Sequence, residues 1–413
     1  MRYYTIILKP FFIYQSNVVF QILISMNIFK SRSSKPPNKG KSRFSKINAW
    51  LHLWLGLGSG IIVVIMAITG CILVFEHEIK ELTSPYLNVE AQSPDKLLPP
   101  SQIYAAVQKV LPNKEIHGVW YNGLDKSIKV DIESDSLIYV NPYNGKITGM
   151  VDHEDFFHIM DEGHRNLWLD REIGSQITAW ATFIFFLLLI SGLILWFPKK
   201  WNKTTRNSSF KIKWDAKFKR LNYDLHNVMG FYTLILAMLI AFTGMLMSFH
   251  WLRESTYWIS GGWADEKDKK EQVVAVKKDT LSKQQMDKLA AADFLWKKVR
   301  TEIAKENKEA VIIHFPDDPK EDFYVCTYMY KGVWRDLYFD STTLELLPKS
   351  HKYIGDERFS KWLMRSNYSL HIGAVGGLPT KIIYFLASLI CASLPITGFY
   401  IWWGKKKKQK TRA

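Results

Sequence analysis

HLWLGLGSGIIVVIMAITGCILVF at residues 52–75 and HNVMGFYTLILAMLIAFTGMLMSF at residues 226–249 carry the same features at the same spacing. Each stretch begins with a histidine and has a glycine four residues later, a Thr-Gly pair further on and a phenylalanine at its end. Each is apolar for long enough to cross roughly 30 Å of hydrocarbon as a helix. The repetition predicts two equivalent membrane spans, each with a histidine imidazole at its N-terminal end.

Two further apolar stretches also match each other. Ser191-Gly192 is followed by Trp196 in one of them, and Thr397-Gly398 is followed by Trp402 in the other. Hydropathy therefore predicts four spans, at about 48–76, 174–197, 228–250 and 379–403. We expect an α-helical membrane protein whose four transmembrane helices form a duplicated pair.

The basic residues that give the chain its net charge of +16 lie beside the ends of these spans. Residues 30–46 carry seven Lys or Arg and no acid, 198–225 carry nine basic and two acidic residues, and 405–413 carry six basic residues. Basic residues next to span ends mark the cytoplasmic side of a membrane protein. We therefore expect both termini in the cytoplasm and do not expect nucleic-acid binding.

Together these signals divide the chain into nine segments. Residues 1–46 form a basic cytoplasmic segment, for which Met26 is an alternative start. The other segments are a first span at 47–77, an outer domain at 78–173, a second span at 174–197, a cytoplasmic loop at 198–225, a third span at 226–250, a second outer domain at 251–370, a fourth span at 371–403 and a cytoplasmic tail at 404–413.

The two outer domains have the same expected order of elements. In the first, a helix precedes three short strands, at Pro100–Leu111, Gly118–Tyr121, Ser127–Ile132 and Leu137–Val140. In the second, the same order is expected at about 282–305, Ala310–Phe315, Asp322–Tyr328 and Val333–Asp340. Each is a small α+β module. The three cysteines form no CxxC pair, so redox chemistry in this chain requires a cofactor.

His52 and His226 are the first candidate cofactor ligands, because the repeat puts them at the cytoplasmic ends of two spans. Haem held between two helices needs an imidazole from each helix at a similar depth. Gly56 and Gly230 lie one turn away on the same helix face and leave room there. The alternative is that both histidines simply lie at the level of the lipid headgroups.

A second pair of histidines is expected near the outer face, and two choices are open. His164 precedes the second span and His371 precedes the fourth, so the duplication relates them. His77 and His250 end the first and third spans and form the competing pair.

The spans "WLHLWLGLGSGIIVVIMAITGCILVFEHEI" at 50–79 and "SLHIGAVGGLPTKI" at 369–382, with the turn "YVNPYNGKITG" at 139–149, resemble the PepSY-associated transmembrane-helix family. The resemblance covers roughly residues 45–405. Within the family, the chain resembles the iron-regulated inner-membrane proteins and ferric-siderophore reductases of bacteria. The resemblance implies periplasmic PepSY-like outer domains and two b haems, with His164 and His371 as ligands of the second.

The function implied is transfer of electrons across the bacterial inner membrane to a ferric siderophore or other ferric chelate, which releases the iron. The short cytoplasmic segments contain no nucleotide-binding motif, so the electrons must come from a separate cytoplasmic donor or from quinol. Aromatic residues of the outer domains are candidates to contact the chelate: Trp120, Tyr143, Trp258, Trp263 and Trp334.

Two other functions remain open at this stage. A PepSY membrane protein without haem could regulate or chaperone a secreted peptidase or another envelope partner, and the span histidines would then be interfacial. A transporter subunit is disfavoured, because the spans lack charged residues at mid-membrane depth.

Overall fold

A computed structural model describes residues 42–410 apart from 113, 133–135, 153–154, 199, 264–286, 305–308, 319–320, 328–333 and 351–357. Nearly all of the predicted segment 1–46, with the alternative start at Met26, lies outside the described residues. So do the ends of two predicted strands, at Tyr328 and Val333.

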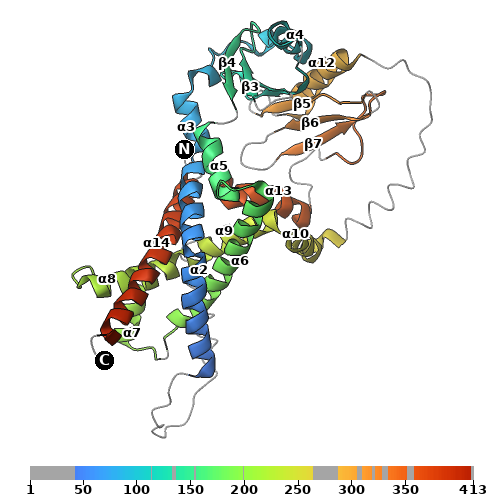
Figure 1. Cartoon of the computed structure of the whole chain (residues 1–413). Coiled ribbons are helices and arrows are strands. Elements are labelled where there is room, and N and C mark those ends of the chain that lie inside the picture. The colour runs from blue at the N-terminus through green and yellow to red at the C-terminus, as the bar shows by residue number, and fades with distance from the viewer. Residues whose placement is uncertain are drawn as a thin grey trace. The chain divides into compact units, whose positions relative to one another are not determined.

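Four long helices dominate the fold (Figure 1). The apolar segments long enough to cross a membrane are Arg43–Leu73 (α2), Arg171–Trp196 (α6), Phe218–Ser248 and Leu378–Gly404. The third is built from α8 (Phe218–Asp224), a π-helical turn η3 (Leu225–Met229) and α9 (Gly230–Ser248); the fourth lies in α14 (Leu378–Lys410). Only 22–39 % of each apolar window is buried within the protein, so most of these side chains are available to lipid. This confirms the four predicted membrane helices.

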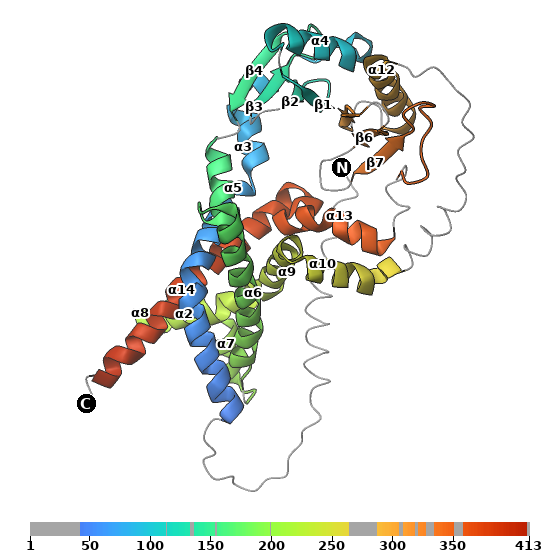
Figure 2. The same cartoon turned by 45° about the vertical axis from the view of Figure 1, so that its right-hand side comes forward.

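Shorter helices surround the long ones. They are α3 (Glu76–Thr83), η1 (Pro85–Leu87), η2 (Pro94–Lys96), α5 (Phe156–Asn166), α7 (Lys203–Phe210), α10 (His250–Tyr257), η4 (Trp258–Gly262), α13 (Phe359–Ile372) and η7 (Ala374–Gly376). Figure 2 shows α10 and α13 from a second direction.

The apolar stretch predicted at 379–403 agrees with the observed Leu378–Gly404, whereas the segment predicted for the fourth span, 371–403, begins before a helix boundary. His371 lies on α13, which is a separate helix from α14. Gly373 ends α13 with φ 71°, and a Cβ there would lie 2.7 Å from the Tyr384 ring. A left-handed residue in contact with an aromatic ring stops the helix, and the chain turns before α14 begins at Leu378.

The strands form one antiparallel sheet of seven. They are β1 (Ile116–Tyr121), β2 (Ile128–Ile132), β3 (Ser136–Val140), β4 (Ile147–Asp152), β5 (Val311–His314), β6 (Phe323–Thr327) and β7 (Arg335–Phe339). Their order across the sheet is β4-β3-β2-β1-β5-β6-β7. The sequence predicted two separate modules, whereas pairing of β1 with β5, with Val119 opposite Ile313, joins them into one sheet. Strand β4 was not predicted, because Gly149 interrupts its short alternating pattern.

Two helices, α4 (Pro100–Val110) and α12 (Lys288–Lys298, continued by the π-helical turn η5 at Val299–Ile303), pack on one face of this sheet. Their buried residues, such as Ile103, Val107 and Leu295, form one core with the strands. The order α4-β1-β2-β3 recurs as α12-β5-β6-β7. Alternating burial along β2 and β7 is what a sheet with one covered face requires.

Candidate functional site

His52 and His226 lie together at one end of the long helices. The centres of their rings are 6.4 Å apart and the ring planes are 89° to each other. His52 lies on α2, and His226 lies on the π-helical turn that leads into α9. Such turns insert an extra residue into the helix and often lie at functional sites.

His164 and His371 form the second pair. Their ring centres are 6.2 Å apart and their planes are 62° to each other. They lie on α5 and α13, outside the four apolar spans. Burial lowers the pKa of both, and together with the neighbouring His164 it lowers the pKa of His371 to about 4. Both imidazoles are therefore neutral at pH 7.

Each histidine directs its Nδ1 at a helix that carries a Ser-Gly or Thr-Gly pair. His226 Nδ1 lies 2.9 Å from Thr397 Oγ1 and 3.1 Å from the carbonyl oxygen of Leu394. His371 Nδ1 lies 3.0 Å from both Thr243 Oγ1 and the carbonyl oxygen of Ile240.

The remaining two histidines repeat this pattern. His164 Nδ1 lies 3.2 Å from Thr69 Oγ1 and 2.8 Å from the carbonyl oxygen of Met66. His52 Nδ1 lies 3.2 Å from Ser191 Oγ. In three of the four cases the second acceptor is therefore the carbonyl three residues before the hydroxyl residue.

These contacts select one tautomer. A carbonyl oxygen can only accept, so the Nδ1 that faces it must carry the proton. The hydroxyl can accept as well, because Thr397 and Thr243 donate to carbonyls of their own helices. A neutral imidazole protonated at Nδ1 keeps a lone pair on Nε2, the nitrogen that binds metals. Each pair thus offers two such nitrogens.

The glycine after each hydroxyl residue lets the imidazole approach the helix. A Cβ on Gly70 would lie 3.0 Å from His164 Cε1, and one on Gly244 would lie 3.2 Å from His371 Cε1. For Gly192 and Gly398 the distances to Cε1 of His52 and His226 are 3.3 Å and 3.4 Å. The contacts at Gly70, Gly244 and Gly192 are tighter than ordinary van der Waals contact, so a larger residue there would displace the ring, and the contact at Gly398 is at the lower limit of ordinary contact.

Gly56 and Gly230, which the sequence places one turn from His52 and His226, have a different environment. A Cβ there would lie 3.9 Å from Leu188 and 3.4 Å from Leu394, and their role in leaving room for a haem stays a prediction. The useful signal was the Ser/Thr-Gly pair near one end of every span. It was visible as a repeat, but its contact with a histidine on another helix was not.

The two pairs lie at opposite ends of the spans. His52 and Thr69, which contacts His164, are 17 residues apart on α2, which corresponds to about 26 Å along a helix. His226 and Thr243 have the same separation in sequence.

The competing outer pair is arranged differently. His77, on α3, is exposed. His250 begins α10 with 70 % of its side chain exposed and lies 3.3 Å from Glu254. Neither histidine is enclosed by helices as His164 and His371 are.

The five predicted chelate contacts lie on separate segments. Trp120, on β1, has the ammonium of Lys129 4.1 Å above its ring. Tyr143 donates its hydroxyl to the Leu124 carbonyl at 2.6 Å, and the Trp334 carbonyl accepts from Arg365 at 3.0 Å. Trp258 and Trp263 are more than half exposed at one end of α10.

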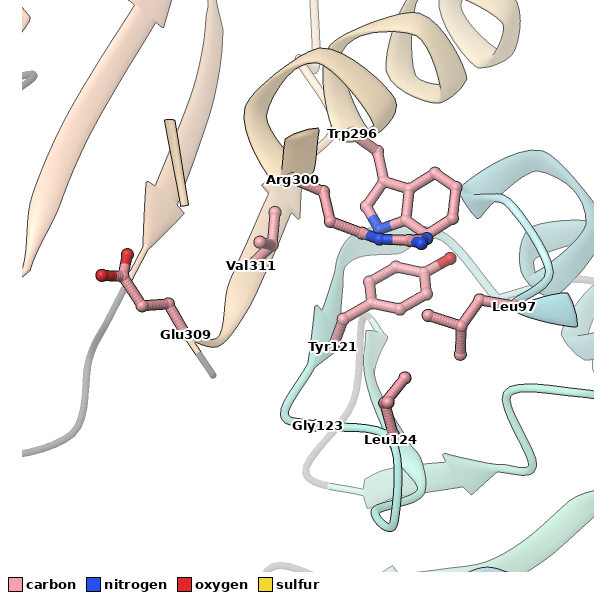
Figure 3. A pocket seen from close by; sticks show the side chains of 8 residues that line it. All are labelled: Leu97, Tyr121, Gly123, Leu124, Trp296, Arg300, Glu309 and Val311. Carbon is pink, nitrogen blue, oxygen red and sulfur yellow. The ribbon is translucent and has the colours of Figure 1, made fainter. Parts of the chain in front are cut away.

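A small cavity lies where the two modules of the sheet meet (Figure 3). It is lined by Leu97, Tyr121, Gly123, Leu124, Trp296, Arg300, Glu309 and Val311. The Trp296 ring lies 5.0 Å from Tyr121 and 4.9 Å from the Arg300 guanidinium, so side chains occupy much of the space. None of the five predicted contacts lines it.

A row of polar aromatic residues that the sequence did not reveal lies across β5, β6 and β7. His314 stacks on Tyr324 at 4.9 Å, and Tyr324 stacks on Tyr338 at 5.0 Å. Burial lowers the pKa of His314 and raises that of the adjacent Cys326 to about 12, so this thiol stays protonated. Asp336, beside Tyr324, pairs at 2.6 Å with Arg365 on α13, the helix that carries His371.

Comparison with known proteins gives one family. Residues 49–405 match the family described as the PepSY-associated TM region. A search of curated proteins finds no match. Since the match covers most of the sequence and all four apolar helices, the chain belongs to the PepSY-associated transmembrane family.

Proposed function

We propose that this protein is a dihaem b-type electron-transfer protein that reduces ferric siderophores on the periplasmic side of the bacterial inner membrane. The observation that carries the proposal is the pair of facing imidazoles at each end of the spans, with ring centres 6.4 Å and 6.2 Å apart. His52 and His226 would hold the inner haem, and His164 and His371 the outer haem.

The spacing of the rings supports a shared metal. A metal–nitrogen bond of about 2.0 Å on each side, with each nitrogen about 1.1 Å from its ring centre, gives roughly 6.2 Å between the centres. The observed separations agree with this value. Among the described residues, no group of three or more His, Cys, Asp or Glu could hold a metal. Two protein ligands suit a haem, whose macrocycle supplies the other four.

The carbonyl and hydroxyl groups around each histidine pair would orient the imidazoles. Hydrogen bonds from Nδ1–H to a carbonyl and a hydroxyl fix the ring and raise the basicity of the other nitrogen, which favours ferric iron. The bound haem would supply reversible one-electron chemistry. Apolar side chains of the spans also pack together, as at Phe183 and Phe249, whose ring centres are 6.3 Å apart.

The two histidine pairs lie at opposite ends of the spans, which suits transfer of electrons from one side of the membrane to the other. His52 and Thr69, which contacts His164, are about 26 Å apart along α2, so haems held by the two pairs would let an electron cross hydrocarbon without moving an ion through it. The basic residues of 198–225 and 405–413 favour a cytoplasmic location for the His52 and His226 end. The repeated order of helix and strands supports a duplicated unit with two PepSY-like modules on the periplasmic side.

The acceptor proposed is a ferric siderophore. One electron reduces Fe(III) to Fe(II), which the hard oxygen ligands of such chelators hold far less tightly, so the iron is released. The electron comes from a cytoplasmic reductase or from quinol. Trp120, Tyr143, Trp258, Trp263 and Trp334 are candidates to contact the chelate, and the Lys129 ammonium lies 4.1 Å above the Trp120 ring.

The test is to purify the protein in detergent, quantify haem per chain and record oxidised and reduced spectra. Two low-spin b haems per chain, reoxidised when a ferric hydroxamate or catecholate is added, are expected. A colourless protein would overturn the proposal and favour a regulatory PepSY protein without a cofactor. Two haems that no ferric chelate reoxidises would retain electron transfer and reject the substrate.

A further inference from the structure

An asparagine lies one helical turn before His226 and contacts the same residue as the histidine does. Asn222 Nδ2 donates to the carbonyl oxygen of Thr397 at 3.0 Å. Thr397 Oγ1 is also the partner of His226 Nδ1, at 2.9 Å. Residues four apart share a helix face, so Asn222 and His226 together attach α8 and η3 to one point of α14.

The same arrangement occurs at two other histidines. Asn367, four residues before His371, donates to the Thr243 carbonyl at 3.1 Å. Asn48, four residues before His52, donates to the Ser191 carbonyl at 3.3 Å and accepts from Ser191 Oγ at 2.8 Å. In each case the asparagine and the histidine bind the same Ser or Thr, the asparagine at its carbonyl and the histidine at its hydroxyl.

The fourth histidine differs. The residue four before His164 is Met160, which has no amide to donate. His164 is attached to α2 by its own Nδ1, through Thr69 and Met66. Of the four paired histidines, three have an asparagine four residues earlier that binds the same Ser or Thr. His164 has none and serves as the comparison within the same protein.

Burying a side-chain amide costs free energy unless its hydrogen bonds are replaced within the protein. Asn222 and Asn367 are 6 % and 8 % exposed, and the Oδ1 of Asn367 has no hydrogen-bond partner among the described residues. Removing an amide from water costs free energy that a single bond to a carbonyl only partly recovers. An apolar side chain of similar shape would fill the same space without this cost.

We infer that Asn48, Asn222 and Asn367 are positioning residues, which fix their helix against the Ser/Thr-Gly pair so that the Nδ1–H bond of the following histidine is held in place. This inference rests on the proposed haem ligation. Without the amide, the helix is free to shift, the Nδ1–H bond weakens, and the imidazole becomes a poorer electron donor to ferric iron. The midpoint potential of that haem then rises.

The test compares Asn222→Leu with Met160→Leu in the full-length protein, with haem content, electron paramagnetic resonance and a redox titration as readouts. Leucine has nearly the shape of asparagine, so packing is kept. For Asn222→Leu we expect the inner haem to titrate at a higher potential, or to be lost, while the outer haem is unchanged. Met160→Leu, at the corresponding position without an amide, should leave both haems as in the wild type.

Unchanged potentials and spectra in Asn222→Leu with two haems bound would overturn the inference and leave the haem proposal standing. An equal change in Met160→Leu would also overturn it. A wild-type protein without haem would instead reject the proposed function. If Asn222→Leu fails to fold, Asn367→Leu applies the same criteria to the outer haem.

Discussion

His226 Nδ1 lies 2.9 Å from Oγ1 of Thr397, a residue 171 positions further along the chain. The contact fixes the proton on Nδ1, because the carbonyl of Leu394 shares the same N–H and can only accept. It therefore decides which nitrogen of His226 remains available as a ligand.

Thr397→Val removes the hydroxyl and keeps the shape of the side chain. We expect inner haem to be retained roughly 10–100-fold less tightly, as is typical when a second partner of a metal-ligating histidine is removed. Haem loss to apomyoglobin, followed by absorbance, measures this. Thr233→Val is the matched control, because among the described residues the buried Thr233 hydroxyl donates to the carbonyls of Met229 and Gly230, one turn earlier on the same span, and to no histidine. Equal haem loss from both variants would contradict the prediction.

His226→Ala should remove about one haem per chain and leave the outer one, because His52 alone cannot hold a low-spin haem. The pyridine haemochrome assay gives the number of haems, and electron paramagnetic resonance identifies the one that remains. His250→Ala is the control, since that side chain is 70 % exposed and faces Glu254. Two haems in His226→Ala, or one in His250→Ala, would show that the pairing is wrong.

The spans and the repeated position of His52 and His226 could be predicted from the sequence because each leaves a local signal, whereas the choice between the two outer pairs could not be made from it. Apolar length reveals a span, and the repeated His-x3-Gly marks the first and third. The Ser and Thr hydroxyls that contact the histidines could not be predicted. Ser191 is 139 residues from His52, and only the packing of α6 against α2 brings them together.

The pairing of strands across the sheet also leaves no local signal in the sequence. Alternation along β1 and β5 reveals two strands, but it does not say that their edges pair with each other. The helix boundary at Gly373 was also missed, because the contact of this glycine with Tyr384 depends on how the chain turns from α13 into α14.

Gly70→Val should displace His164, because even a Cβ at this position would lie 3.0 Å from His164 Cε1. The neighbouring backbone of α2 cannot move without disturbing the span, so the ring must tilt. We expect the outer haem to lose its low-spin signal while the inner one keeps it. Gly58→Val on the same helix is the control, since a Cβ at Gly58 meets nothing within 4 Å. Identical spectra for the two variants would count against close packing of His164.

Glu309→Ala should destabilise the outer sheet, because it leaves Arg335 buried without its charge partner. The Glu309 and Arg335 side chains are 3 % and 8 % exposed and form an ion pair, with Thr327 as a further acceptor for Arg335 at 3.1 Å. Breaking such a pair typically costs about 3–5 kcal/mol, whereas replacing both charges by apolar residues costs far less. Thermal unfolding of the full chain in detergent, followed by circular dichroism, should show an earlier transition for Glu309→Ala. The double variant Glu309→Leu with Arg335→Met should recover much of the loss. If Glu309→Ala unfolds at the same temperature as the wild type, the ion pair contributes nothing to stability.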